Sequence, residues 1–179
     1  MRWFWIDRFE DFRRHQLAVA LKNVTLAEEP LDEYLPGNPH YPHSLMIEGM
    51  AQTGGLLIAE PYGFARRVVL AKVGKAVFHR FAYPGDTLRY TAELQNEQES
   101  GAVVAGRVSV GEETVADLEL WFAFLDERFG SGPLFPLESL LRTLRVLRLY
   151  DVGVDENGQR LLPPAEMLKA EADSLAADR

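Results

Sequence analysis

The sequence predicts an α+β fold in which an antiparallel sheet wraps around one buried central helix, followed by a C-terminal helical extension. Between residues 67 and 127, apolar and polar residues alternate with the period of two that is typical of strands. Between residues 44 and 60, apolar residues fall on nearly every side of a helix, which indicates burial all round. After residue 130 the apolar spacing is again helical.

A first strand and a long loop precede the central helix. Residues 15–25, HQLAVALKNVT, carry Leu17, Val19 and Leu21 at alternate positions, which predicts a strand. Residues 28–43 contain four prolines, which forbid a helix and most strand pairing. We therefore expect tertiary contacts to hold this segment as a loop.

The central helix is predicted over residues 44–60, SLMIEGMAQTGGLLIAE. Ser44 follows Pro42 and is the expected N-cap. Gly49, Gly54 and Gly55 weaken the helix intrinsically. Such small residues fit a helix that another backbone or a ligand approaches closely.

Four consecutive strands are predicted after the helix. Their sequences are RVVLAKVGKAVFHRF, DTLRYTAELQNEQ, AVVAGRVSVG and ETVADLELWFAFLDE. The breaks at residues 99–101 and 111–113 are short and contain glycine, as hairpin turns do. We expect an antiparallel meander that curls around the helix and hides it on every side.

The chain is expected to divide near residue 130. Residues 1–129 would form the sheet-and-helix domain, and residues 130–179 a linker and the helical extension. Within residues 137–150 the leucines share one helical face, which predicts a helix that packs on the sheet or on a partner subunit. Residues 163–179 predict a short polar helix with a frayed end.

Composition excludes several classes of function. The chain has 179 residues, of which 47% are hydrophobic and 26% charged, as in ordinary globular domains. Its formal net charge of -8 argues against sequence-independent binding of nucleic acid. The absence of cysteine excludes disulfides, thiolate zinc sites and a cysteine nucleophile. The four histidines show no i, i+4 pair, and there is no glycine-rich phosphate loop, so we expect neither a metal nor a cofactor.

We also expect a cytoplasmic location without membrane attachment. The aromatic N-terminus is interrupted by Arg2, Asp7 and Arg8, so it lacks the apolar core of a signal peptide. The apolar runs fall far short of the ~20 residues that span a bilayer.

Glu48 is the main candidate for chemistry. Its neighbours in the helix are almost all apolar, and burying a carboxylate is costly unless a partner compensates. It is either an acid/base group or a structural glutamate that faces the rim or pairs with an arginine. Gln52 lies one turn further on the same face and is either its hydrogen-bonding partner or a structural amide. Backbone N–H groups near His43 and Ser44 could stabilise an oxyanion, although every helix has such an end.

Two segments together closely resemble the β-hydroxyacyl-(acyl carrier protein) dehydratase family of fatty acid synthesis. They are YLPGNPHYPHSLMIEGMAQTGG and KVGKAVFHRFAYPGDTL. The resemblance spans roughly residues 17–127, whereas the tail after residue 130 has no counterpart in the compact family members. The matching features are Pro36-Gly37-Asn38-Pro39, Pro42, Leu45, Ile47-Glu48, Met50-Ala51-Gln52, Lys75, Phe78 and Pro84-Gly85-Asp86.

This resemblance implies a hot-dog fold, a homodimer that could assemble further, and active sites at the dimer interface. In the family a histidine removes the proton α to the thioester, and a helix carboxylate of the other subunit protonates the departing β-hydroxyl. Glu48 occupies the position of that carboxylate and Gln52 that of the family's helix glutamine. The substrate would be a thioester of acyl carrier protein or of CoA, and the residues expected to contact it are Gln52, Pro39, Ser44, Gly49 and Phe78.

One departure from the family concerns the base. The family's catalytic histidine is replaced by Tyr34, whose unperturbed pKa of about 10 makes it a poor base at neutral pH. His43 or His40 could serve instead, or both are ordinary polar residues of the loop. His43 is slightly favoured, because the end of a helix that carries free N–H groups disfavours the cation and leaves the ring able to accept a proton. His79, beside Phe78 in a strand, is expected to be structural.

Three functions remain open at this stage. The first is dehydration of 3-hydroxyacyl thioesters. The second is thioester hydrolysis, with Glu48 acting on water. The third is a domain that binds acyl chains or acyl carrier protein and lost catalysis with the histidine.

Overall fold

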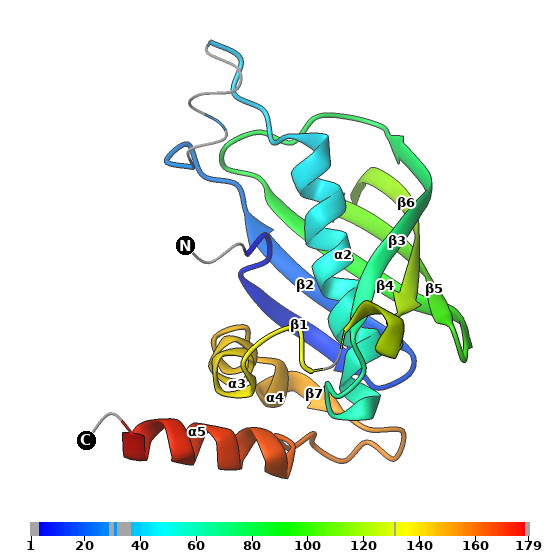
Figure 1. The fold of residues 1–179 in the computed structure, drawn as a ribbon. Coiled ribbons are helices and arrows are strands. Elements are labelled where there is room, and N and C mark those ends of the chain that lie inside the picture. Colours follow the sequence, from blue (N-terminus) through cyan, green and yellow to red (C-terminus); the bar gives the residue numbers. More distant parts are fainter. Residues whose placement is uncertain (1–3, 29–30, 32–36, 131, 178–179) are drawn as a thin grey trace.

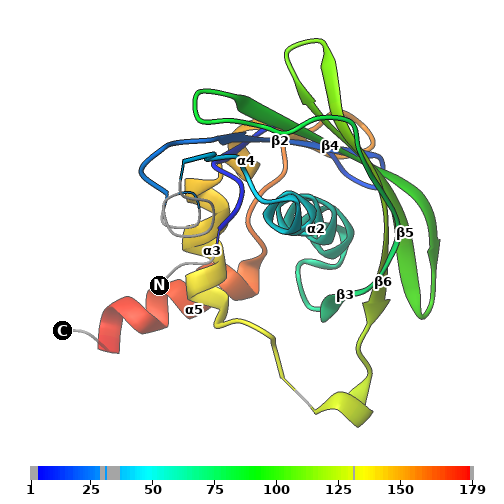
Figure 2. The ribbon, with the colours of Figure 1, turned by 90° about the horizontal axis from the view of Figure 1, so that it is seen from above.

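A seven-stranded sheet curves around one long helix (Figures 1 and 2). The computed structural model describes residues 4–28, 31, 37–130 and 132–177. The strands are β1 (Arg8–Arg13), β2 (Leu17–Asn23), β3 (Val68–Phe78), β4 (Thr87–Gln98), β5 (Gly101–Val110), β6 (Glu113–Phe124) and β7 (Gly153–Val154). The helices are α2 (His43–Ala59), α3 (Leu137–Val146), α4 (Leu149–Val152) and α5 (Ala165–Ala177), with short 3-10 turns η1 (Glu60–Tyr62) and η2 (Glu127–Phe129).

Helix α2 occupies the concave side of the sheet, as predicted. Met46, Met50, Leu57 and Ile58 are fully buried against it. The expected N-cap is wrong: the cap is Pro42, with φ -59° and ψ 134°, and Ser44 is the second helical residue. Proline fixes φ at a helical value and is tolerated at a helix start, so the helix begins before the serine.

The four predicted strands are present, but the predicted meander is only partly right. The strand order is β3-β6-β5-β4-β2-β1-β7, so β3 pairs with β6 and not with β4. The connection from β3 to β4 is a crossover in place of a hairpin. It is tied to other loops by backbone hydrogen bonds, from Tyr41 to the carbonyl of Ala82 at 2.7 Å and from Val24 to that of Asp86 at 2.9 Å.

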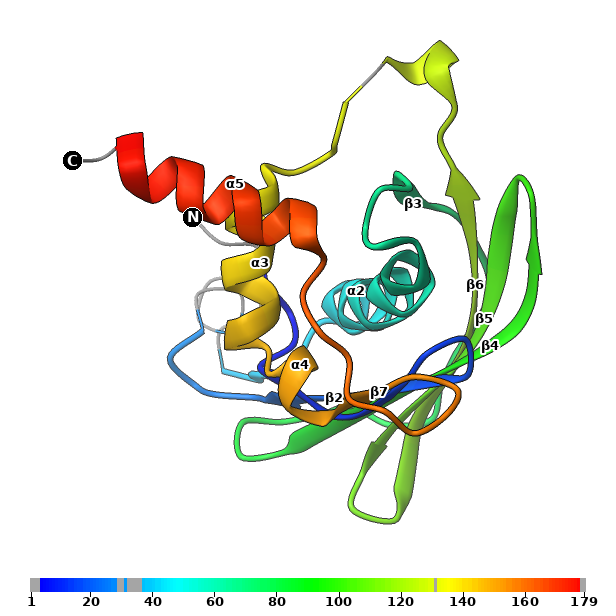
Figure 3. The same ribbon diagram turned by 90° about the horizontal axis from the view of Figure 1, so that it is seen from below.

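The C-terminal extension packs on this chain's own sheet (Figure 3). Strand β7 runs parallel to β1, and neither of these two strands was predicted from the sequence. The Phe9 N–H donates a hydrogen bond to the carbonyl of Leu147 at 2.7 Å. The single helix predicted over residues 137–150 is wrong, because Arg148 adopts a positive φ of 61° and separates α3 from α4. Leu141, Leu144 and Leu147 are buried in the same core as α2, while the division at residue 130 stays a prediction.

Among the described helices, none is long and apolar enough to cross a membrane.

Candidate active site

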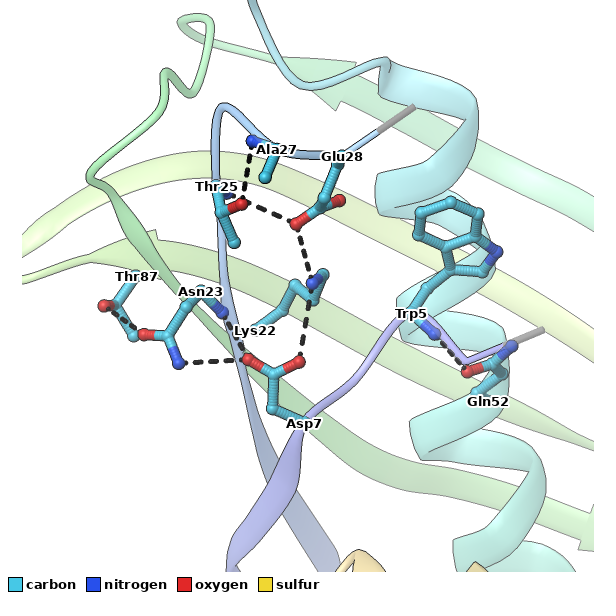
Figure 4. Close-up of polar contacts among 9 residues, drawn as sticks. All are labelled: Trp5, Asp7, Lys22, Asn23, Thr25, Ala27, Glu28, Gln52 and Thr87. Atoms are coloured by element: carbon cyan, nitrogen blue, oxygen red, sulfur yellow. Dashed lines mark hydrogen bonds and ion pairs between the residues drawn. The ribbon is translucent and has the colours of Figure 1, made fainter. Parts of the chain in front are cut away.

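The Glu48 carboxylate is positioned by a short chain of hydrogen bonds. Gln52 Nε2 donates to Glu48 Oε1 at 3.0 Å. The other end of the same amide, Gln52 Oε1, accepts from the backbone N–H of Trp5 at 2.9 Å (Figure 4). Because both ends of the amide are engaged, its NH₂ group stays directed at the carboxylate. Of the two interpretations of Gln52, a partner of Glu48 is the one that the structure supports.

A polar cluster fixes the segment that carries Trp5 (Figure 4). Lys22 is only 8% exposed, and its ammonium contacts Glu28 at 2.8 Å and Asp7 at 3.4 Å. The second oxygen of Asp7 accepts from the backbone N–H of Asn23 at 2.7 Å. A buried charge is tolerated when paired and hydrogen-bonded in this way. The cluster thereby ties the chain just after Trp5 to strand β2.

Glu48 and Gln52 line a cavity of about 660 Å³. This is within the roughly 300–1,000 Å³ of small-molecule sites. Glu48 is half-buried, and among the described residues it forms no ion pair with an arginine. The lining comes from one face of α2, the start of β3, the N-terminal segment and the extension, and it is largely apolar. Representative lining residues are Phe4, Ala51, Leu56, Phe64, Val69 and Phe122.

The two candidate histidines lie together in a different place. The His43 ring stacks on Phe78 with centroids 3.9 Å apart and planes 1° from parallel, and Phe81 lies next to both histidines. Burial lowers the pKa of His43, and His40 lowers it further, so the ring is neutral as expected but chiefly because of burial. His43 Nε2 and His40 Nδ1 are buried without a hydrogen-bond partner among the described residues.

Glu48 and the histidines of the same chain face different directions. His43 and Glu48 are five residues apart in α2, which puts them about 140° apart around the helix axis. Neither histidine is among the described residues that line the Glu48 cavity. Within one chain the structure therefore does not bring the candidate acid and the candidate bases together. Tyr34 lies outside the described residues.

The other expected substrate contacts are also spread out. Only Gln52 lines the cavity with Glu48. Gly49 is buried, and a Cβ there would lie 2.7 Å from Tyr90 Cζ and 2.9 Å from the Trp5 carbonyl oxygen, so it serves packing within the chain. Phe78 packs under His43. Ser44 is exposed and Pro39 half-buried, both near the start of α2.

The sequence did not indicate that the N-terminal segment and α3 contribute to this cavity. Phe4, Ile6, Leu137, Leu140 and Thr143 line it although they lie far from Glu48 in sequence. The leucines that share one face of residues 137–147 indicated that this face of the helix would be buried. They could not indicate which part of the protein the face would pack against.

Comparison with known proteins identifies relatives of most of this chain. The sequence model of the FabA-like domain family matches residues 4–119. A protein of Desulforamulus reducens named 3-hydroxyacyl-(acyl-carrier-protein) dehydratase FabZ is 38% identical over 119 residues, covering 66% of this chain and 84% of that protein. One of the same name from Campylobacter fetus is 33% identical over 129 residues, covering 68% and 87%.

Solved structures share the fold at low identity. The dehydratase heterocomplex ApeI:P from Xenorhabdus doucetiae aligns with a TM-score of 0.58 at 15% identity, over 69% of this chain and 84% of that one. A hypothetical thioesterase with coenzyme A from Streptococcus pneumoniae aligns with a TM-score of 0.54 at 13% identity, over 66% and 84%. The predicted hot-dog fold with a C-terminal helical extension is confirmed.

Proposed function

Because this chain belongs to the FabA-like domain family, we propose that it is a cytoplasmic dehydratase that converts 3-hydroxyacyl thioesters into trans-2-enoyl thioesters in fatty acid or related lipid synthesis. The names of its relatives favour acyl carrier protein as the thioester carrier. CoA remains the alternative carrier, since one structural neighbour binds it. The observation that carries this assignment is the Glu48 carboxylate, fixed by Gln52 and facing a largely apolar cavity.

The reaction needs one base and one acid. The base takes the proton from the carbon α to the thioester, and the electron pair of the broken C–H bond forms the new carbon–carbon double bond. The bond from the β carbon to its hydroxyl breaks, and protonated Glu48 gives its proton to the hydroxyl, which leaves as water. The thioester stays intact.

The start of α2 is the proposed contact for the thioester carbonyl. The N–H groups of Leu45 and Met46 both donate to the carbonyl of Pro42. The N–H groups of His43 and Ser44 are therefore the ones at this end that can donate to an external oxyanion.

His43 is the proposed base, with His40 as the second candidate. The low pKa of His43 keeps the ring neutral and able to accept a proton at neutral pH. Since His43 and Glu48 of one chain face apart, this pair requires the histidine of one subunit and the carboxylate of another. The proposed enzyme is therefore a homodimer.

The edge of the sheet supports a dimer. Strand β3 is the last strand on its side, and Leu70, Val73 and Val77 on it are 38–39% exposed. At the other end of the sheet the two-residue strand β7 pairs with the end of β1, at Phe12 and Arg13. A long exposed edge with apolar residues is typical of a strand that pairs with another chain. Two β3 strands related by a two-fold axis satisfy this pairing, and assembly of such dimers into larger particles stays a prediction.

The test is to offer the purified chain crotonyl thioesters of acyl carrier protein and of CoA. A dehydratase run in reverse hydrates the double bond, which is followed as loss of enoyl absorbance, and releases no thiol. Release of free thiol would contradict dehydration and indicate a thioesterase. If neither occurs but acyl-pantetheine raises the melting temperature, the chain is an acyl-binding domain.

A further inference from the structure

The cavity beside Glu48 has two walls from very different parts of the chain. One consists of α2 and the start of β3. The other consists of residues 133–136 and of α3, and Figures 2 and 3 show α2 between the sheet and α3. We propose that this second wall, the extension wall (residues 133–147), forms part of the acyl-chain site and sets the length of chain that the enzyme accepts. Identifying the ligand as an acyl chain rests on the proposed function.

The extension wall offers apolar surface to a ligand. Leu137, Leu140 and Leu147 line the cavity, together with Phe135. The hydroxyl of Thr143, which also lines it, donates to the carbonyl of Ser139 at 2.9 Å, so this polar group is already satisfied within α3. An apolar ligand leaves few unpaired polar groups against this wall.

The two arginines of the cavity are engaged as well. Arg67 donates to the carbonyls of Asp126 and Phe129. The Arg66 guanidinium lies over the rings of Tyr62 and Phe124, at 3.9 and 4.5 Å from their centroids. These hydrogen bonds and ring contacts hold both guanidinium groups against the protein, and apolar side chains make up most of the remaining lining. The chemistry of the lining therefore favours a hydrocarbon chain.

The opposite wall leaves room for such a chain. Ala51, Gly55 and Ala59 are spaced by four residues along α2 and all line the cavity. A Cβ at Gly55 would find only Phe122 at 3.5 Å within 4 Å. The small side chains on this face thus place the empty volume beside Glu48, where an acyl chain attached to the reacting carbons would begin.

The helical part of the extension wall, α3, is held against the core of the chain. Leu125 N–H donates to the Arg67 carbonyl at 2.9 Å before the wall, and Phe9 N–H donates to that of Leu147 at 2.7 Å at its end. Leu141 and Leu144, on the side of α3 toward the core, are fully buried. A wall held in this way limits the chain length sterically, since lengthening the ligand requires that the wall move.

The wall also lies outside the part of the chain that matches the family. That match ends at residue 119, before the wall begins. The extension is therefore a feature by which this chain can differ in substrate range from the dehydratases that it resembles.

The experiment compares binding of saturated butyryl, octanoyl and dodecanoyl pantetheine by calorimetry to the full-length protein. Burial of each methylene should tighten binding by about fourfold until the wall is reached. Ser139 lines the cavity and is exposed, so Ser139→Trp adds bulk there without emptying the core. It should lower the ratio of dodecanoyl to butyryl affinity at least tenfold. Arg142→Trp, an exposed position of α3 that does not line the cavity, is the matched control and should leave the ratio unchanged.

A second variant covers the case in which Ser139→Trp does not fold. Phe135 lines the cavity and is 60% exposed, so Phe135→Ala removes bulk from the wall and should raise the ratio of dodecanoyl to butyryl affinity. Equal affinity ratios in the wild type and both wall variants would overturn the proposal. So would a change in particle mass caused by Ser139→Trp without a change in the ratio, because the cavity would then receive a second subunit.

Failure of the dehydratase assignment gives a different result. Chain-length-dependent binding that responds to Ser139→Trp, in a protein that does not hydrate crotonyl thioesters, would support the extension wall and contradict the dehydratase. Hydration of crotonyl thioesters, with an affinity ratio that the wall variants leave unaltered, would support the dehydratase and contradict the extension wall.

Discussion

Gln52 donates a hydrogen bond to the Glu48 carboxylate from one helical turn away, at 3.0 Å, while the Trp5 backbone holds the other end of its amide. The N-terminal segment is thereby coupled to the proposed general acid. The resemblance placed a glutamine at this position, and the structure adds what orients it.

Gln52→Leu should lower kcat for dehydration by about tenfold to a hundredfold. A hydrogen bond to a charged group contributes roughly 1.5–3 kcal/mol, and its loss frees the carboxylate to rotate. Steady-state kinetics on a 3-hydroxyacyl thioester measures this change. Gln95→Leu, an exposed glutamine of β4, is the control and should keep the wild-type kcat. An unchanged kcat in Gln52→Leu would mean that the amide is only structural.

Two glycines of α2 should respond oppositely to alanine. At Gly49 a Cβ meets Tyr90 Cζ at 2.7 Å and the Trp5 carbonyl oxygen at 2.9 Å, so Gly49→Ala should lower the free energy of unfolding by about 1–3 kcal/mol. At Gly55 the nearest atom is Phe122 Cε1 at 3.5 Å, so Gly55→Ala should raise it by about 0.5–1 kcal/mol. Urea denaturation gives both values, and equal effects would contradict this packing.

His43 should make the protein less stable in acid. Its pKa in the folded chain is below the ordinary 6.5, so the unfolded chain binds a proton there more readily. Its contribution is constant above about pH 6.5 and becomes increasingly unfavourable as the pH falls through and below that value. In His43→Phe, which keeps an aromatic ring on Phe78, this dependence should vanish. The free energy of unfolding of the wild type, relative to the variant, should therefore decrease between neutral pH and about pH 5. A constant difference would show that His43 is not buried as a neutral ring.

Val73→Lys should convert the proposed dimer into a monomer, because a lysine on an edge strand opposes pairing with another strand. Light scattering after size exclusion gives the mass. Leu162→Lys, at an exposed residue outside β3, should leave the proposed dimer intact. A Val73→Lys protein of unchanged mass would place the subunit interface elsewhere.

The central part of the fold could be predicted from the sequence because its patterns are local. The apolar residues around α2 and the alternation in β4 to β6 each report burial of the element that carries them, whereas no residue of β3 is buried within this chain. The pairing of β3 with β6 could not be read in this way, since it depends on a crossover held by contacts such as Tyr41 to Ala82. The helix break at Arg148 was also missed, because residues 137–150 contain no glycine or proline that would indicate it.

The candidate site was predictable in part for the same reason. Glu48 and Gln52 belong to one helix, so their spacing alone placed them on one face. The cavity depends on Phe4 and Leu140, which reach Glu48 only through tertiary structure. In the proposed mechanism the partner of Glu48 in catalysis comes from another subunit, and no spacing within one chain encodes that.

The central claim is that Glu48 is the general acid of a dehydratase, and the rate of crotonyl-thioester hydration by Glu48→Gln tests it most directly. A general acid–base group contributes about a hundredfold to ten-thousandfold to rate, so the variant should lose activity by that factor while keeping its melting temperature. Glu99→Gln, in the exposed turn between β4 and β5, should hydrate at the wild-type rate. A folded Glu48→Gln protein that hydrates crotonyl thioesters as fast as the wild type would contradict the claim.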